Sequence, residues 1–95
     1  MRAITMEAVN AFVNGRNFKS SNTVVRRNCF YLHGNKIAWY DERGSLWITN
    51  CGWQTNTTKE RLNGLPNVSI VQKNYQWYLN GQKWNGEPIC VSNFK

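Results

Sequence analysis

Residues 29–50 read CFYLHGNKIAWYDERGSLWITN, and this stretch decides the fold. It contains three runs of β-branched and aromatic residues, separated by Gly34-Asn35 and by Asp41–Gly44. Glycine at the first position of a two-residue loop favours a type II′ hairpin turn, and a four-residue loop is another common connection. The stretch therefore predicts a three-stranded antiparallel meander at the centre of the molecule.

The loop lengths set the register of this meander and so decide which side chains share a face. The first hairpin places Leu32 opposite Ile37 and Phe30 opposite Trp39. Because side chains alternate along a strand, a slip of one residue would move each of them to the other face. In the predicted register one face is wholly apolar: Phe30, Leu32, Ile37, Trp39, Leu46 and Ile48. We expect this face to carry the core.

The opposite face of the predicted meander is aromatic and basic. It carries Cys29, Tyr31, His33, Lys36, Ala38, Tyr40, Ser45, Trp47 and Thr49. Such a face is either a stacking platform for a ligand or a second, thinner core beneath the C-terminal hairpin. The sequence leaves both alternatives open.

The N-terminal segment predicts a helix over Ile4–Asn14, with Thr5 as its N-cap and Gly15 as a left-handed terminator. Its apolar stripe needs a partner, for which the apolar face of the meander is available. Residues 16–22 are expected to form a polar connector, and residues 23–25 a short strand.

The C-terminal half predicts a second short helix and a hairpin. Thr57 and Glu60 have the capping-box spacing, with Leu62 facing inward. Residues 68–72 and 76–79 alternate as strands, and Asn80-Gly81 is the strongest short hairpin signal in the chain. That turn places Trp77 opposite Trp84, and residues 89–91 are expected to add an edge strand. The element order predicts a single α+β domain over residues 1–95: an antiparallel β-meander with an N-terminal helix packed on one face, a second short helix and a C-terminal β-hairpin.

Composition limits the classes of partner and the compartment. Twelve Lys and Arg against five Asp and Glu give a net charge of +7, which favours polyanions. No apolar run approaches the ~20 residues that a membrane span needs, and the N-terminus lacks a signal-peptide pattern. Three cysteines without close spacing are typical of a reducing cytosol. We therefore expect a cytoplasmic protein that has no membrane partner.

Neither a metal site nor a catalytic site is expected from the spacing of the reactive side chains. Cys29 and His33 would stand ~13 Å apart on a straight strand, at ~3.3 Å per residue, which zinc bonds of ~2.0–2.3 Å cannot bridge. The sequence has no Cys-x2-Cys pair, P-loop or dinucleotide fingerprint, and no carboxylate is spaced to assist His33. We expect no cofactor and no enzymatic activity.

Binding is the remaining class of function. Single-strand binders that tolerate any sequence stack bases on aromatic side chains and hold phosphates with flanking Lys and Arg. A short helix N-terminus near Trp53 is a further candidate, for a phosphate. The candidate ligand-binding residues are Tyr31, His33, Lys36, Tyr40, Trp47, Arg26, Arg27, Trp53, Lys59 and Arg61. They suit nucleic acid, an anionic nucleotide or an acidic protein.

The segment GWQTNTTKERLNGL at residues 52–65 resembles one found in a family of small tailed-bacteriophage proteins. The stretches at residues 7–18, 32–38 and 77–81 agree with it, so the resemblance covers most of the chain. The resemblance implies an accessory protein acting in the cytoplasm of an infected bacterium, and it carries no catalytic residues. Two functions follow as hypotheses: binding of nucleic acid or a nucleotide, or inhibition of a host or anti-phage defence protein by protein–protein binding. Self-association through an exposed edge strand is a third.

Overall fold

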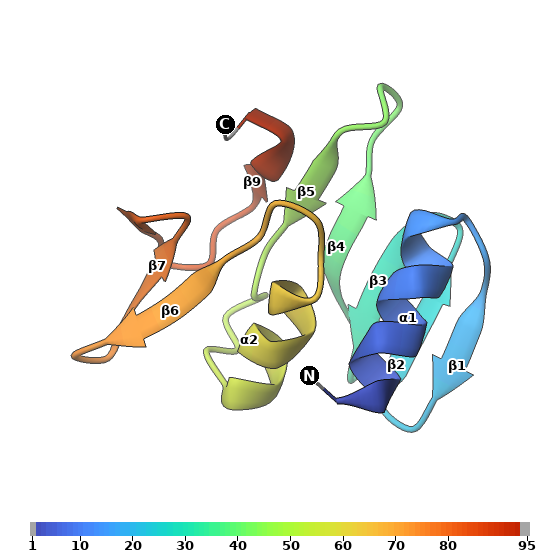
Figure 1. Cartoon of the computed structure of the whole chain (residues 1–95), viewed down its shortest axis with the longest axis horizontal. Helices are drawn as coiled ribbons and strands as arrows, with labels where there is room; N and C mark the ends of the chain where they lie inside the picture. Colours follow the sequence, from blue (N-terminus) through green and yellow to red (C-terminus); the bar gives the residue numbers. More distant parts are fainter. Residues whose placement is uncertain (1, 94–95) are drawn as a thin grey trace.

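A six-stranded antiparallel sheet in the order β1-β2-β3-β4-β5-β9 forms the main layer of the structure. The computed structural model describes residues 2–93. The strands are β1 (Phe18–Ser20), β2 (Thr23–Arg26), β3 (Cys29–Leu32), β4 (Asn35–Tyr40), β5 (Leu46–Ile48) and β9 (Ile89–Cys90). The predicted meander is thus extended on both sides, by a hairpin before it and by the C-terminal segment after it (Figure 1).

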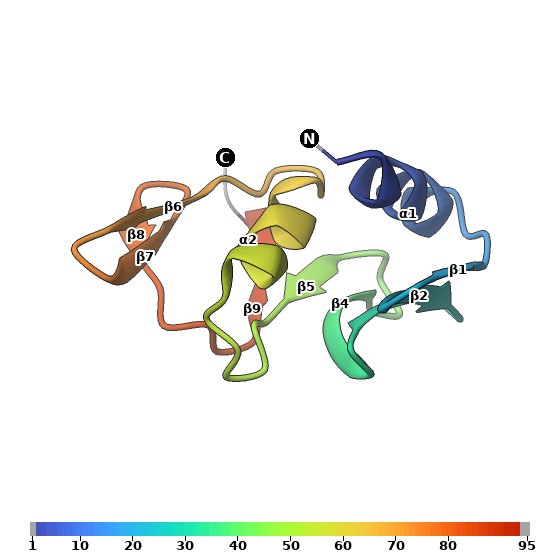
Figure 2. The same ribbon diagram turned by 90° about the horizontal axis from the view of Figure 1, so that it is seen from below.

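The two helices lie on the same side of this sheet, and a second sheet lies beside it (Figures 1 and 2). Helix α1 covers Ala3–Val13 and α2 covers Asn56–Asn63. The second sheet contains β6 (Ile70–Lys73), β7 (Gln76–Leu79) and β8 (Gln82–Lys83), and a 3-10 turn, η1 (Val91–Asn93), follows β9. The predicted α+β class is confirmed. Neither helix described in residues 2–93 is long and apolar enough to cross a membrane.

Helix α1 begins and ends one residue earlier than predicted, and Gly15 terminates it as predicted. Its N-cap is Arg2, so Thr5 lies inside the helix, where its side chain is fully buried. At the other end Gly15 has φ +69°, and the backbone N–H of Arg16 donates to the carbonyl of Ala11 at 2.8 Å. This left-handed C-terminal motif needs glycine because other residues are strained at that angle.

The turn of the first predicted hairpin is shifted by one residue. His33 and Gly34 form the two-residue loop, with φ +52° and +79°, so that Leu32 pairs with Asn35. Positive φ at both central positions is a type I′ turn, whose twist matches that of the flanking strands. The predicted type II′ turn at Gly34-Asn35 is therefore wrong.

A β-bulge in β4 then changes which side chains face the core. Tyr31 pairs with Lys36 and Phe30 with Ala38, so Ile37 is an extra residue in the ladder. Ile37 and Ala38 are both buried, as expected when a bulge turns two successive side chains toward one face.

The bulge exchanges Trp39 and Tyr40 between the two faces of the sheet. Trp39 pairs with Cys29 and with Trp47, which places it opposite the helices. Tyr40 packs against Phe12 of α1, with ring centroids 4.8 Å apart and planes 25° apart. The second loop also contains one more residue than predicted, since Tyr40 pairs with Leu46. The predicted register of the meander is thus wrong around Trp39, although its strands are confirmed.

The remaining elements follow the prediction with local shifts. Strand β1 forms within the segment predicted as a connector, and β6 begins at Ile70 instead of residue 68. The N-cap of α2 is Thr55, whose hydroxyl accepts from the N–H of Thr58, instead of Thr57. The Asn80-Gly81 turn and the packing of Trp77 against Trp84, at 6.1 Å between ring centroids, are confirmed.

One hydrophobic cluster joins both sheets and both helices. Phe12 from α1, Phe30 from β3, Leu62 from α2 and Trp77 from β7 all belong to it. The helix-facing side of the six-stranded sheet and the buried side of the second sheet therefore share a core, and the other side of the large sheet lies outside it.

Candidate functional site

The side of the six-stranded sheet away from α1 and α2, called the outer face below, collects the aromatic and basic side chains. Strand register places on it Lys19, Val24, Arg26, Cys29, Tyr31, Lys36, Trp39, Trp47 and Cys90. No helix covers this side in the part of the chain that the structure describes, and the second sheet lies beside it (Figure 2). Tyr31, Trp39 and Trp47 are each half-buried. The predicted second core beneath the C-terminal hairpin does not form here.

Two tryptophans form the centre of the outer face. The rings of Trp39 and Trp47 are 6.3 Å apart between centroids and within 7° of parallel. The indole Nε1 of Trp47 donates to Oδ2 of Asp41 at 2.8 Å, which fixes that ring. A pair of parallel aromatic rings is suited to stacking against planar groups.

Two of the three aromatic rings on the outer face, those of Trp39 and Tyr31, each have a cation over them. The Lys36 ammonium lies 4.8 Å from the Trp39 ring centroid, and the Arg26 guanidinium lies 5.8 Å from that of Tyr31. Both distances are in the range of cation–π attraction. The outer face is therefore positively charged where it is aromatic.

Asp41 is the carboxylate attached to this face, and its role is structural. Besides the Trp47 indole, it accepts from the backbone N–H groups of Arg43 and Ser45, both at 2.9 Å. These bonds, with the Trp47 bond contributing most, hold the pKa of the Asp41 carboxyl below its usual value. Asp41 therefore stays ionised and anchors the loop between β4 and β5.

Arg27 and His33 occupy turns beside the outer face. Arg27 lies at the tip of the β2–β3 hairpin with φ +51° and is exposed. His33 is exposed in the β3–β4 turn, with its Nε2 3.3 Å from the side-chain nitrogen of Asn22. Tyr40, by contrast, packs on the helix side of the sheet, and burial raises the pKa of its hydroxyl. The structure therefore removes Tyr40 from the predicted site.

Arg61 does not belong to a surface cluster, contrary to the prediction. Only 1% of it is exposed, and its guanidinium donates to the hydroxyls of Thr5 at 2.9 Å and Thr23 at 3.1 Å. It also pairs with the Glu60 carboxylate at 2.5 Å. Arg61 thus ties α2 to α1 and β2. Its helix neighbour Lys59 is half-buried and reaches Gln72 of β6 at 3.4 Å, away from the outer face.

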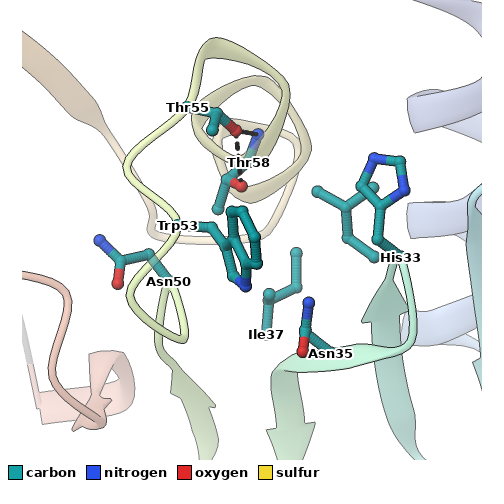
Figure 3. A pocket seen from close by; sticks show the side chains of 8 residues that line it. His33, Asn35, Ile37, Asn50, Trp53, Thr55 and Thr58 are labelled. Carbon is teal, nitrogen blue, oxygen red and sulfur yellow. Dashed lines mark hydrogen bonds between the residues drawn. The ribbon is translucent and has the colours of Figure 1, made fainter.

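Trp53 lines a pocket on the helix side, at the end of the sheet where β3 turns into β4. The pocket has a volume of about 360 Å³ and is lined by Leu32, His33, Asn35, Ile37, Asn50, Trp53, Thr55 and Thr58. In Figure 3 the Trp53 indole stands on one side and the His33 ring on the other, with Ile37 and Asn35 between them. Of the predicted ligand-binding residues, His33 and Trp53 line this pocket, whereas Arg26, Tyr31, Lys36 and Trp47 lie on the outer face.

Sequence reasoning missed Trp39 and Lys19 as members of the outer face. Trp39 was assigned to the core because the bulge at Ile37 was not foreseen, and Lys19 was assigned to a connector. Two adjacent apolar residues, Ile37 and Ala38, followed by two adjacent aromatics are a signal for such a bulge, since strict alternation would bury only one of each pair.

The cysteines do not converge on a metal site within residues 2–93. Cys29 and Cys90 lie on the outer face, separated by the strands that carry Trp39 and Trp47. No group of three His, Cys, Asp or Glu side chains in the described residues is placed to hold a metal ion.

Comparison with known proteins places the chain among bacteriophage proteins. No curated protein and no solved structure matches it. The family model described as Kyanoviridae Gp96 protein matches residues 1–95, in agreement with the resemblance to tailed-bacteriophage proteins. The chain therefore belongs to the Kyanoviridae Gp96 family of bacteriophage proteins.

Proposed function

We propose that this phage protein binds single-stranded nucleic acid along its outer face, without catalysing a reaction, in the cytoplasm of the infected bacterium. The observation that carries the proposal is the parallel pair Trp39 and Trp47, flanked by cations on an uncovered sheet face. Single-strand binders combine such aromatic platforms with a basic track for the backbone.

The aromatic residues supply stacking that tolerates any sequence. Every base has a π-face, and a stacked base contributes roughly 1–3 kcal/mol as measured by alanine substitution. Tyr31, Trp39 and Trp47 are half-buried, so their positions are held while part of each ring stays accessible.

The basic residues supply the phosphate contacts. Lys36 and Arg26 lie over the aromatic rings, and Lys19 shares their face. A cation–π pair contributes only about 0.5–1 kcal/mol at an exposed site, so each cation can move from its ring to a phosphate at small cost. The same rings then become free to receive bases.

The salt dependence of binding tests this proposal directly. Binding of a fluorescent 12-mer single strand, measured by anisotropy from 50 to 500 mM salt, is expected to weaken steadily. With the three cations of the outer face in contact, the slope of log K against log salt is about −2, and about −3 if Arg27 joins them. An affinity that is the same across this range would contradict the proposal.

Matched variants locate the binding surface. Trp39→Ala is expected to weaken oligonucleotide binding roughly 5- to 100-fold, whereas Tyr75→Ala leaves it unchanged. Tyr75 is a suitable control because it is 90% exposed on the second sheet. Likewise, Lys36→Ala reduces the salt slope by about 0.7, while Lys73→Ala on β6 does not.

A protein partner is the second candidate, and exposed apolar residues on α1 favour it. Met6 is 59% exposed and Val13 41% exposed, and their i, i+7 spacing puts them on one side of the helix. Such a surface suits inhibition of a host or anti-phage defence protein. A complex recovered from host lysate after nuclease treatment, and lost with Met6→Glu, would support this candidate over nucleic acid.

A further inference from the structure

The pocket beside Trp53 is built differently from the outer face and calls for a different ligand. Leu32 and Asn35, which line it, are paired on the helix side of the sheet, whereas the neighbouring pair Tyr31 and Lys36 faces outward. The pocket therefore opens on the opposite side of the sheet from the proposed strand-binding surface.

Trp53 has an exposed side chain on a hydrogen-bonded backbone turn. Trp53 is 57% exposed, and its backbone N–H donates to the carbonyl of Asn50 at 2.8 Å across a tight turn. The central residues of that turn, Cys51 and Gly52, have φ +54° and +82°. The Asn50 side chain also accepts from the N–H of Gly52 at 2.8 Å. The turn thus holds the backbone of Trp53, from which the indole borders the pocket.

The lining of the pocket consists of apolar and uncharged polar side chains and one imidazole, that of His33. None of the lining residues is Lys, Arg, Asp or Glu. The N-terminus of α2 is already capped, because the Thr55 hydroxyl accepts from the N–H of Thr58 at 3.1 Å. A phosphate at this helix end, one of the sequence-based expectations, would have no side-chain cation beside it in the pocket. The lining therefore favours a neutral ligand.

The shape and polarity of the lining favour a planar heterocycle. Leu32 and Ile37 supply apolar lining. Figure 3 shows Ile37 next to the indole of Trp53, with the amide of Asn35 and the ring of His33 nearby as hydrogen-bonding groups. Aromatic walls stack on planar rings, and amide side chains pair with the edges of bases. A volume of about 360 Å³ is at the small end of ligand pockets and suits a ligand of one or two ring systems.

We propose that this pocket binds the base of a neutral nucleoside, stacked on Trp53 and hydrogen-bonded by Asn35. The site is independent of the outer face: it holds one base without a phosphate, whereas the outer face follows a charged backbone. It gives the protein a means of recognising a single base or a free nucleoside.

Titration of the full chain with adenosine, guanosine, cytidine and uridine, followed by amide NMR shifts, tests the proposal. At least one nucleoside is expected to shift the amides of residues 33–37 and 51–58. Its affinity should change less than about two-fold between 50 and 500 mM salt, because no counterions are released from an uncharged ligand. Trp53→Ala should weaken it roughly ten-fold or more, Trp53→Phe less, and Tyr75→Ala not at all.

The combination of nucleoside and oligonucleotide binding separates this proposal from the strand-binding proposal. No shifts with any of the four nucleosides up to its solubility limit, or equal nucleoside binding by Trp53→Ala and the parent, overturns the pocket proposal. Oligonucleotide binding that persists in that case leaves the outer-face proposal intact. Nucleoside binding without oligonucleotide binding supports the pocket proposal and contradicts the outer-face proposal. A melting temperature of Trp53→Ala equal to that of the parent shows that the variant is folded, as expected for an exposed side chain.

Discussion

At the scale of single residues, Arg61 shows how a side chain with the chemistry of a ligand-binding group is used to hold the fold. It is almost fully buried and bonds to Thr5 of α1, Thr23 of β2 and Glu60 beside it in α2. A buried cation is tolerated when it is paired and hydrogen-bonded, and these partners accept from its Nε and Nη1. The basic surface of the protein is consequently smaller than its net charge suggests.

We predict that Arg61→Leu lowers the free energy of unfolding by roughly 2–4 kcal/mol, because it removes the donor to the Thr5 and Thr23 hydroxyls and the cation beside the Glu60 carboxylate. Urea unfolding followed by tryptophan fluorescence measures the change. Lys59→Ala, on the same helix, is the matched control and should change stability by less than about 0.5 kcal/mol. Equal stability of Arg61→Leu and the parent would show that the network contributes nothing.

The lowered pKa values of Glu60 and Asp41 make the stability of the fold depend on pH. Burial raises the pKa of Glu60, but hydrogen bonds from Thr5 and the backbone of Arg2, and the Arg61 guanidinium, lower it further than burial raises it. The pKa of Asp41 is also lowered, chiefly by the Trp47 indole. Because the pKa values of these carboxyls are lower in the folded than in the unfolded chain, they stabilise the fold above about pH 4. This stabilisation is lost as the pH falls through the pKa values of the folded state.

Urea unfolding at a series of pH values tests this dependence. The free energy of unfolding should be nearly constant from about pH 7 to 5 and fall at lower pH. In the double variant Asp41→Asn, Glu60→Gln the fall should be shallower. A fall of the same steepness in parent and variant would assign the acid sensitivity to other groups.

At the scale of elements, Gly86 couples the segment before β9 to the turn that carries Trp53. Its carbonyl accepts from the N–H of Asn50 at 3.0 Å and from the Thr49 hydroxyl at 2.6 Å. A Cβ at Gly86 would lie 2.1 Å from the Asn50 side chain, and its φ is +93°. Only glycine allows these two segments to approach so closely.

We predict that Gly86→Ala destabilises the protein more than Gly81→Ala, by roughly 1–3 kcal/mol. Gly81 is a matched control because its φ is +86° but a Cβ there would meet nothing within 4 Å. Both variants carry the left-handed backbone penalty of roughly 1–2 kcal/mol, so their difference isolates the contact with Asn50. Equal unfolding midpoints in urea would mean that Asn50 moves aside freely.

The edges of the large sheet bear on self-association. Its edge strands are β1, with three residues, and β9, with two. Short edges offer few unpaired backbone groups to a second chain. Self-association through an edge strand remains a prediction, and a monomeric mass by light scattering would contradict it.

At the scale of the whole molecule, the two sheets depend on one core. Residues of both sheets, such as Ile48 and Leu79, belong to the same buried cluster. The second sheet has three short strands and cannot bury an apolar face without its neighbours. It is therefore not expected to fold as a separate unit.

We predict a single cooperative unfolding transition for the chain. Far-UV circular dichroism, near-UV circular dichroism and tryptophan fluorescence should give coincident urea curves. An earlier transition in the near-UV signal, to which the packed pair Trp77 and Trp84 contributes, would show that the second sheet unfolds first.

The sequence alone determined the features that depend on a few neighbouring residues. Turn chemistry predicted the Asn80-Gly81 hairpin and the glycine-terminated end of α1, both of which the structure confirms. Strand alternation predicted the meander and the α+β class, because local backbone preference and side-chain period are encoded within each element.

Only the tertiary structure decided which residues form the candidate sites. The bulge at Ile37 places Trp39 on the outer face and Tyr40 in the core, and Arg61 is buried because Thr5 and Thr23 lie within reach of its guanidinium. These outcomes depend on packing between segments far apart in the chain, where burial and hydrogen-bond satisfaction outweigh local preference.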